Sequence, residues 1–306
     1  MISTEYANNI FEQPWWLDIV APGCWKELLV RDTSNNVIAR QVVVYKKMRI
    51  YMPHHTQTLG IWVADSEKGD YGAQKRIIQE LNDQIKSYKR VWMNLAPEND
   101  YVLPYRWLGY SIEPLFTYRI DDLTNLDRLY QGFNKTAKKN IKSAKNKVAI
   151  SYETDLSELW DMLNKTFEAQ NRRNPMRRDL IEKIVTQCDE NNSGKYISAK
   201  DNEGNVHSCA YFVYDDNVCY YLFGATDPEF RSSGAQSLVL WEGIQFASKH
   251  SKSFDFEGSM IEGIENFFRQ FNSKCVVYYG IRKNSFFDNV FGLIKPKIKR
   301  MLGYKI

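Results

Sequence analysis

Residues 218–282 decide the fold, and they read VCYYLFGATDPEFRSSGAQSLVLWEGIQFASKHSKSFDFEGSMIEGIENFFRQFNSKCVVYYGIR. Aromatic and other β-favouring residues fill three short runs, and two longer segments of helical composition separate them. Helices that alternate with strands in this way predict an α/β (α+β) fold with a mixed sheet. The predicted elements are a strand (Val218–Ala225), a turn (Thr226–Gly234), a helix (Ala235–His250), a strand (Ser253–Glu257), a helix (Glu262–Phe271) and a strand (Cys275–Ile281).

A short polar segment precedes the helix that is predicted to begin at Ala235. Arg231 supplies a cation, Ser232 and Ser233 supply hydroxyls, and Gly234 leaves the backbone free to turn before the first helical residue. The free N–H groups and the dipole at a helix N-terminus favour anions. Residues Arg231–Ala235 are therefore expected to bind an anion.

The composition is that of a soluble globular protein. With 306 residues, 43% of them hydrophobic and 25% charged, the chain has room for one large domain or two average ones. No apolar run approaches the roughly 20 residues of a membrane span, and the first six residues lack the features of a signal peptide. The five cysteines are scattered along the sequence, which predicts reduced thiols and a cytoplasmic location. The net charge of +4 is too small to indicate nucleic-acid binding by itself.

Two parts of the chain repeat one order of elements. A strand, an aromatic helix and a second strand follow one another between residues 90 and 120, and the same order recurs between residues 253 and 281. Gly109 and Asn272 end the two helices at positions that favour a left-handed cap. We therefore expect two copies of one α/β unit, residues 1–122 and 151–306, joined by a basic segment at 123–150.

The basic segment carries a stripe of lysines. A single helix over Leu129–Lys147 would place its apolar residues on one face, and on the opposite face Lys135, Lys138, Lys139, Lys142 and Lys145. Like charges at these spacings repel one another. The stripe is therefore either a solvated surface or a contact for a polyanion, phosphates above all.

Two other regions are basic. Residues 171–178 form a loop that contains Arg172, a candidate substrate ligand. Residues 284–306 combine aromatic residues with lysines, which indicates a helix that docks either onto the protein or onto an anionic membrane surface.

Several common motifs are absent from the sequence. It contains no GxGxxG, GxxxxGK[ST], GxSxG or HExxH pattern. His54 and His55 form an isolated pair without a cluster of carboxylates or cysteines, so we expect no metal.

The order of elements in 218–282 resembles the core of the GNAT acyltransferase superfamily, and four motifs resemble its FemAB/FemX-like branch more narrowly. These motifs are LFGA (222–225), FDFEGS (254–259), GIENFFRQFN (263–272) and FNKTAKKNIK (133–142). The resemblance implies two tandem GNAT-like domains with mixed sheets and flanking helices. It also implies transfer of an acyl or aminoacyl group from acyl-CoA or aminoacyl-tRNA to an amine. Gln236 stands where the family's phosphate loop has a second small residue, which weakens the case for coenzyme A.

Transfer of an acyl group to an amine needs a base for the amine and a donor for the developing oxyanion. Glu257 is the first candidate for the base, with helix capping or an arginine partner as the alternative. Asp255 alternates with apolar neighbours and is expected to face the same cleft. Tyr221 and Tyr211 are candidate donors to the carbonyl, with core packing as the alternative, and Arg269 is expected to pair with Glu257 or to bind an anionic substrate group.

The sequence therefore predicts an N-acyltransferase, an N-acetyltransferase or aminoacyltransferase, of FemAB type. Its acceptor would be a small-molecule or nucleotide-linked amine of a cell-envelope or polysaccharide precursor, and no DNA partner is expected. The alternative is a non-catalytic GNAT-like module that binds RNA or an anionic membrane through the basic segment.

Overall fold

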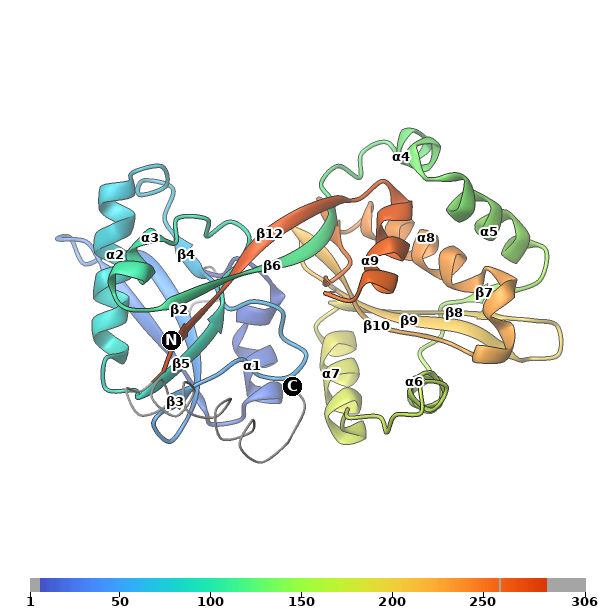
Figure 1. Cartoon of the computed structure of the whole chain (residues 1–306), viewed down its shortest axis with the longest axis horizontal. Helices are drawn as coiled ribbons and strands as arrows, with labels where there is room; N and C mark the ends of the chain where they lie inside the picture. Colours follow the sequence, from blue (N-terminus) through green and yellow to red (C-terminus); the bar gives the residue numbers. More distant parts are fainter. Residues whose placement is uncertain (1–5, 259, 285–306) are drawn as a thin grey trace, which may run out of the picture. The chain divides into compact units, whose positions relative to one another are not determined.

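A computed structural model describes residues 6–258 and 260–284 of the chain (Figure 1). These residues divide into two compact units. The first contains the described residues up to Leu115 and from Tyr278 onward, and the second is Phe116–Val277.

Two long strands contribute residues to both units. Strand β6 (Ser111–Ile120) enters the second unit at Phe116, and β12 (Lys274–Lys283) enters the first at Tyr278. The unit bounds differ from the predicted bounds of 1–122 and 151–306 because both strands continue across the division. The helical segment 123–150 consequently lies inside the second unit.

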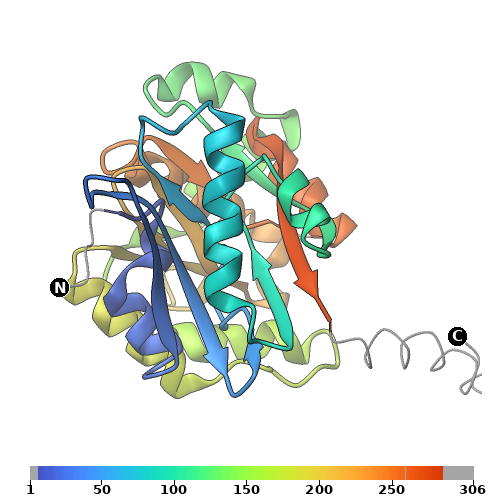
Figure 2. The ribbon, with the colours of Figure 1, turned by 90° about the vertical axis from the view of Figure 1, so that its left-hand side faces the viewer.

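The first unit is a mixed sheet that carries helix α2 along one face, in front of the strands in Figure 2. The strand order is β1-β2-β3-β5-β12, and β4 pairs with β2. The buried face of α2 includes Ile77, Ile78, Leu81 and Ile85, which recur at the helical period. The strands are β1 (Trp25–Arg31), β2 (Val37–Lys46), β3 (Arg49–Ile50), β4 (Ile61–Val63) and β5 (Arg90–Asn94). The helices are η1 (Ile10–Glu12), α1 (Pro14–Val20), α2 (Tyr71–Ile85) and α3 (Leu103–Trp107).

The second unit is a sheet with helices on both faces. Its strand order is β6-β11-β10-β9-β8-β7. On β9, Tyr211 contacts α7 on one face, and Phe212 packs under Gly243 of α8 on the other. The remaining strands are β7 (Ala149–Ser151), β8 (Gly194–Lys200), β9 (Val206–Tyr214), β10 (Val218–Thr226) and β11 (Ser253–Asp255). The helices are α4 (Leu126–Gly132), α5 (Lys135–Lys145), α6 (Leu156–Glu168), α7 (Arg178–Glu190), η2 (Pro228–Ser233), α8 (Ala235–Ala247), α9 (Glu262–Phe268) and η3 (Arg269–Phe271).

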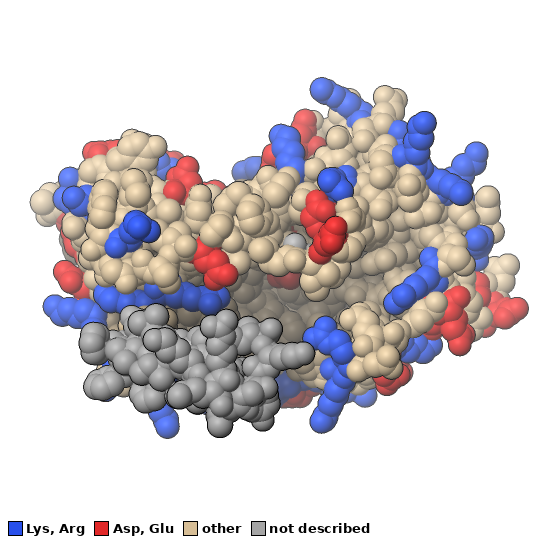
Figure 3. Space-filling model, in the orientation of Figure 1, with Lys and Arg blue, Asp and Glu red and all other residues tan. Residues whose placement is uncertain are grey.

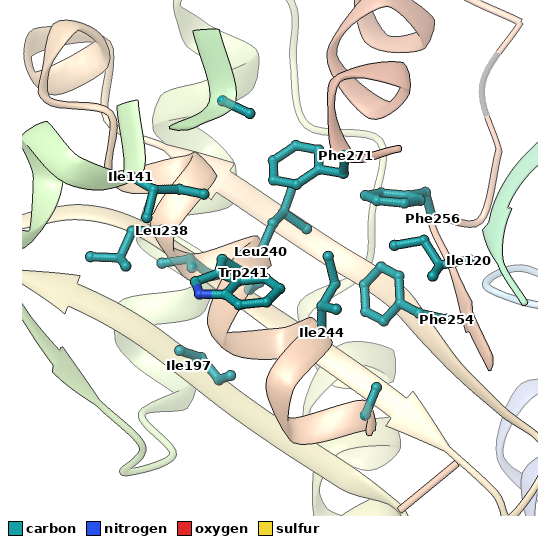
Figure 4. Close-up of a cluster of buried hydrophobic side chains, with 14 of the residues drawn as sticks. Ile120, Ile141, Ile197, Leu238, Leu240, Trp241, Ile244, Phe254, Phe256 and Phe271 are labelled. Carbon is teal, nitrogen blue, oxygen red and sulfur yellow. The ribbon is translucent and has the colours of Figure 1, made fainter. Parts of the chain in front are cut away.

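Helix α8 forms the centre of the core of the second unit. It is apolar around most of its circumference because it packs on the sheet and on α5. Figure 4 shows Trp241 and Ile244 of α8 among Ile197 of β8, Ile141 of α5 and Phe254 of β11. This core holds the carboxyl end of β11 and the start of α8 in fixed positions.

The basic segment forms two helices, α4 and α5, rather than the single helix predicted over 129–147. Asn134 separates them, because its side-chain oxygen accepts a hydrogen bond from Ala137 N (2.8 Å) and so begins a new helix. Phe133 has an extended backbone at the end of α4, and its ring packs against those of Trp241 and Phe271, each at a centroid distance of 5.2 Å. The buried face of α5 comprises Ala137, Ile141 and Ala144.

The described part of the chain contains no helix that is both long and apolar enough to cross a membrane. The predicted membrane-contacting helix falls within 284–306, of which residues 285–306 lie outside the described residues.

Candidate active site

The candidate site lies where two parallel strands of the second unit separate. Strands β10 and β11 pair at their start, and Tyr220 with Asp255 is the last pair. Strand β10 continues to Thr226, whereas β11 ends two residues before its predicted end at Glu257. A bulge between Tyr221 and Phe223 also shifts the pairing of β10 with β9. A gap at the carboxyl ends of parallel strands is a common location for ligands.

A cavity of about 770 Å³ occupies this gap. Its volume falls within the range of roughly 300–1,000 Å³ that is typical of small-molecule sites. Five parts of the second unit line it. They are residues 221–226 of β10, residues 256–258 after β11, the start of α8 with Arg231 and Asn140, α6 with the loop that follows it, and one side of α9 with Ile261 before it (Ile261, Gly263, Ile264, Phe267 and Phe268).

Glu257 lies in the wall of this cavity and has an unusual backbone. Its φ of 60° is in the left-handed region, which residues other than glycine rarely adopt. Its N–H donates a hydrogen bond to Asp255 Oδ1 (2.7 Å), which holds the turn. Burial of the carboxyl group, and secondly the charge of Asp255, raise the pKa of Glu257 well above its usual value. A cavity-lining carboxyl with a raised pKa has the properties of a general base for an amine.

Asp255 does not line the cavity, in contrast to the expectation that it faces the same cleft. It is 1% exposed, and its Oδ1 also accepts a hydrogen bond from Thr117 Oγ1 (2.5 Å). Its Oδ2 lies 3.4 Å from Arg119 Nε. Asp255 therefore fixes the turn at Glu257 and contributes a neighbouring negative charge.

The structure separates the two tyrosine candidates. Tyr221 lines the cavity, its hydroxyl lies over Gly224, and its side chain is hydrogen bonded to Gln236. Burial raises the pKa of Tyr221 to about 12, so the phenol stays protonated and can donate a hydrogen bond. Tyr211 is fully buried on the other face of the sheet, where its hydroxyl donates to Asp189 Oδ1 (3.0 Å). For Tyr211 the structure shows the core-packing alternative.

The predicted phosphate segment is only partly directed at the cavity. Arg231 and Gly234 line it, whereas Ser232 is exposed outside the lining. Ser233 is buried, and its Oγ accepts a hydrogen bond from Ala235 N (3.2 Å), which occupies one N–H group of the helix start. Gln236 does line the cavity, with its side chain turned to Tyr221.

Gly234 has a packing role in this segment. Its φ is +85°, and a Cβ at this position would lie 2.4 Å from Asn140 O of α5. A residue with a side chain is therefore disfavoured both by the backbone conformation and by the available space.

The arginine candidates differ in position. Arg172 lines the cavity, and its guanidinium lies 6.0 Å from the centre of the Phe167 ring. Arg269 is exposed outside the cavity and pairs with Glu265 (Nε–Oε1 3.6 Å) rather than with Glu257.

None of the predicted lysine ligands lines the cavity. Lys135, Lys139 and Lys142 are exposed on α5, and Lys138 Nζ donates to Gln131 O (2.6 Å). Figure 3 shows Lys and Arg side chains projecting from the surface over α4 and α5. The lysines form a surface of their own rather than part of the cavity wall.

Some residues of the site had no signal in the sequence. Thr117 and Arg119 hold Asp255 from a strand that lies more than 130 residues earlier in the chain. The apolar wall formed by Ile261, Ile264 and Phe267 was not assigned to a ligand either. Gln236 was recognisable in the sequence, because it replaces a small residue of the family's phosphate loop.

The first unit lacks a corresponding opening among its described residues. Its parallel strands β3 and β5 pair only at Arg49 and Ile50. Residues that follow β3 then fill the gap, with Leu59 N donating to Asn94 O (2.8 Å) and Asn94 Nδ2 donating to Gln57 O (3.2 Å). A Cβ on Gly60 would lie 2.4 Å from Asn99 Oδ1. The described residues contain no cluster of three or more His, Cys, Asp or Glu side chains that could hold a metal ion.

One family model matches part of the chain. Residues 131–269 match the family model described as "Acetyltransferase (GNAT) domain". This part of the chain is therefore similar to GNAT acetyltransferase domains. No curated protein sequence matches the chain significantly.

Solved structures show the fold. The chain is similar to the crystal structure of FemX, with a TM-score of 0.69, 13% identity and coverage of 91% of this chain and 96% of FemX. It is also similar to L-PGS from Bacillus licheniformis (TM-score 0.54, 10% identity, 94% and 91% covered). A third match is a tandem GNAT protein from the clavulanic acid biosynthesis pathway (TM-score 0.52, 9% identity, 88% and 94% covered). The chain thus has the FemX-like tandem GNAT fold, and the predicted fold class is confirmed.

Proposed function

We propose that the protein is an N-acyltransferase of FemAB type. It transfers an acyl or aminoacyl group from acyl-CoA or aminoacyl-tRNA to an amine of a cell-envelope or polysaccharide precursor in the cytoplasm. The observation that carries this proposal is the carboxyl group of Glu257, which lies in a substrate-sized cavity with a raised pKa.

The mechanism follows from the groups around the cavity. The acceptor arrives as an ammonium ion, and Glu257 takes one proton from it, so that the nitrogen gains a free electron pair. The nitrogen attacks the carbonyl carbon of the donor, and the carbonyl electrons move onto oxygen. The phenol of Tyr221, which lines the same cavity, donates a hydrogen bond to this oxyanion in the proposed mechanism. Collapse of the intermediate breaks the bond to the sulfur of coenzyme A or the ribose oxygen of tRNA. This leaving atom takes the second proton from the attacking nitrogen, which becomes the amide, and Glu257 releases its proton to solvent.

Arg231 and Gly234 bind the phosphate-bearing part of the acyl donor. Arg231 offers a guanidinium for a phosphate group, and Gly234 allows close approach of the backbone. Gln236 and Ser233 occupy positions that a pyrophosphate-binding loop would leave open, which favours aminoacyl-tRNA. The tandem GNAT protein described above is described as being without acetyl-CoA, and acyl-CoA remains the other donor to test.

The test is a panel of acyl-CoA and aminoacyl-tRNA donors with amines of amino sugars and peptides. The proposal predicts donor consumption that depends on the amine. Glu257→Gln should slow turnover more than it weakens acceptor binding. Glu262→Gln, at an exposed position of α9 outside the cavity lining, is the matched control and should behave as the unmodified protein. Absence of amine-dependent consumption with every donor would refute the proposal.

The second candidate function is binding of a polyanion without catalysis. It is favoured by the position of Lys135, Lys139 and Lys142, which are exposed on α5 and lie outside the cavity lining. Binding through them to RNA or to anionic vesicles should weaken steeply with salt, and Lys139→Glu with Lys142→Glu should abolish it. Salt-insensitive binding, or none, would contradict this function.

A further inference from the structure

Part of the cavity wall in the second unit is apolar and open to solvent. Ile261 is 59% exposed and Ile264 is 39% exposed, and both line the cavity together with Phe267. Met260, which is 66% exposed, lies next to them in the chain. Large apolar side chains that are grouped and exposed indicate a contact that is missing in the free protein.

The apolar wall continues on other elements around the cavity. Leu163 and Phe167 of α6 and Met176 of the following loop line it as well. The charged residues in the lining are Arg172, Arg231 and Glu257. Away from these three residues, the lining formed by the described residues offers no oppositely charged partner to a charged group of a ligand. Its apolar side chains can instead contact a hydrocarbon group of the ligand.

The apolar wall lies beside the candidate catalytic residues. The ring centroid of Tyr221 lies 6.1 Å from that of Phe268, which also lines the cavity, and Phe268 lies 4.8 Å from Phe256, the residue before Glu257. The ring of Phe267 lies 6.2 Å from that of Phe268. A group that contacts the wall therefore belongs to the substrate near its reacting atoms rather than to a distant carrier.

We propose that the substrate carries an apolar group of several carbons beside the reacting atoms, and that Ile261, Ile264 and Phe267 bind it. This inference rests on the proposed acyl transfer, because the reaction defines which atoms react. The group is either the acyl chain of the donor or the substituent of the acceptor amine. Each methylene that is transferred from water onto the wall should strengthen binding by about fourfold.

The experiment measures kcat/KM in two series. One series extends the donor from acetyl-CoA to octanoyl-CoA and from alanyl-tRNA to phenylalanyl-tRNA, and the other extends the acceptor from ethylamine to octylamine. We expect kcat/KM to rise with chain length in one series, and that series identifies the substrate that carries the group. Ile264→Ser should reduce the gain for the longest member by about 10-fold. Leu103→Ser changes an exposed apolar side chain of the first unit (50% exposed, against 39% for Ile264) and should leave the series unchanged.

The outcomes separate this inference from the proposed function. Turnover that is independent of chain length in both series would overturn the apolar site and leave acyl transfer intact. An equal rise in Ile264→Ser would overturn it too. If no donor is consumed at all, the proposed function fails. Calorimetric Kd values for the same amines and acyl-CoA esters then test the apolar site by itself. Kd values that fall with chain length in the unmodified protein but not in Ile264→Ser support the site. Kd values that do not change with chain length in the unmodified protein overturn it.

Discussion

Replacement of Gly234 by alanine tests how the start of α8 is placed beside the cavity. Gly234 has a φ of +85°, and an added Cβ would lie 2.4 Å from Asn140 O, which belongs to α5. Gly204, in the β8–β9 turn of the same unit, has a φ of +87° with nothing within 4 Å of an added Cβ. The two glycines share the backbone conformation and differ in packing, so Gly204→Ala is the matched control.

The expected magnitudes follow from these two contributions. A left-handed conformation costs a residue with a side chain roughly 1–2 kcal/mol, which is the full effect expected for Gly204→Ala. Overpacking against a backbone atom adds about 1–3 kcal/mol, so Gly234→Ala should lose about 2–5 kcal/mol. For a unit of this size each kcal/mol lowers Tm by about 2–4 °C, which gives a fall of about 2–8 °C for the control and about 4–20 °C for Gly234→Ala.

The assay is thermal unfolding followed by circular dichroism, together with urea unfolding of both variants. Because Asn140 also lines the cavity, Gly234→Ala should weaken donor binding as well, whereas Gly204→Ala should not. If the two variants lose the same stability, the close contact between α8 and α5 is not as described, and the argument for glycine at this position fails.

Three further predictions concern buried polar groups. Asp255→Asn retains an acceptor for Glu257 N and removes a negative charge, so the pKa of Glu257 should fall. The acid limb of the pH–kcat profile should then move to lower pH. An unchanged limb would contradict the effect of the Asp255 charge on Glu257. Tyr221→Phe should lower kcat by about 100-fold. Tyr211→Phe should leave kcat unchanged and lower the free energy of unfolding by about 1 kcal/mol. Equal kcat values for the two variants would refute the roles of Tyr221 as oxyanion donor and Tyr211 as a core residue. Burial raises the pKa of Glu12 from 4.5 to about 7, so the folded state binds a proton more tightly and stability should fall by about 3 kcal/mol as pH rises from 4.5 to 7. Urea unfolding of Glu12→Gln at both ends of this range should lack that dependence.

Elements with a strong local signal could be predicted from the sequence. The apolar face of α2 follows the helical period, and Gly109 and Asn272 both adopt the predicted left-handed conformation. In each case the residues that determine the structure are adjacent in the chain.

The parts that sequence reasoning missed depend on contacts between distant residues. Tyr211 and Tyr221 looked equivalent because β9 and β10 are buried on both faces, so no alternation shows which face meets the cavity. The turn at Glu257 depends on Asp255, which Thr117 and Arg119 hold from β6. The break at Asn134 did have a local signal, since asparagine favours a helix N-cap, but the regular lysine spacing suggested one continuous helix.

The central claim is that Glu257 accepts the proton of the attacking amine. The most direct measurement is the pH dependence of kcat for the unmodified protein and for Glu257→Gln with the same donor and amine. The claim predicts that kcat of the unmodified protein rises with pH along a limb above the usual glutamate pKa of about 4.3. In Glu257→Gln that limb should disappear and kcat should fall by about 100- to 10,000-fold. A variant that keeps both the limb and the rate would contradict the claim.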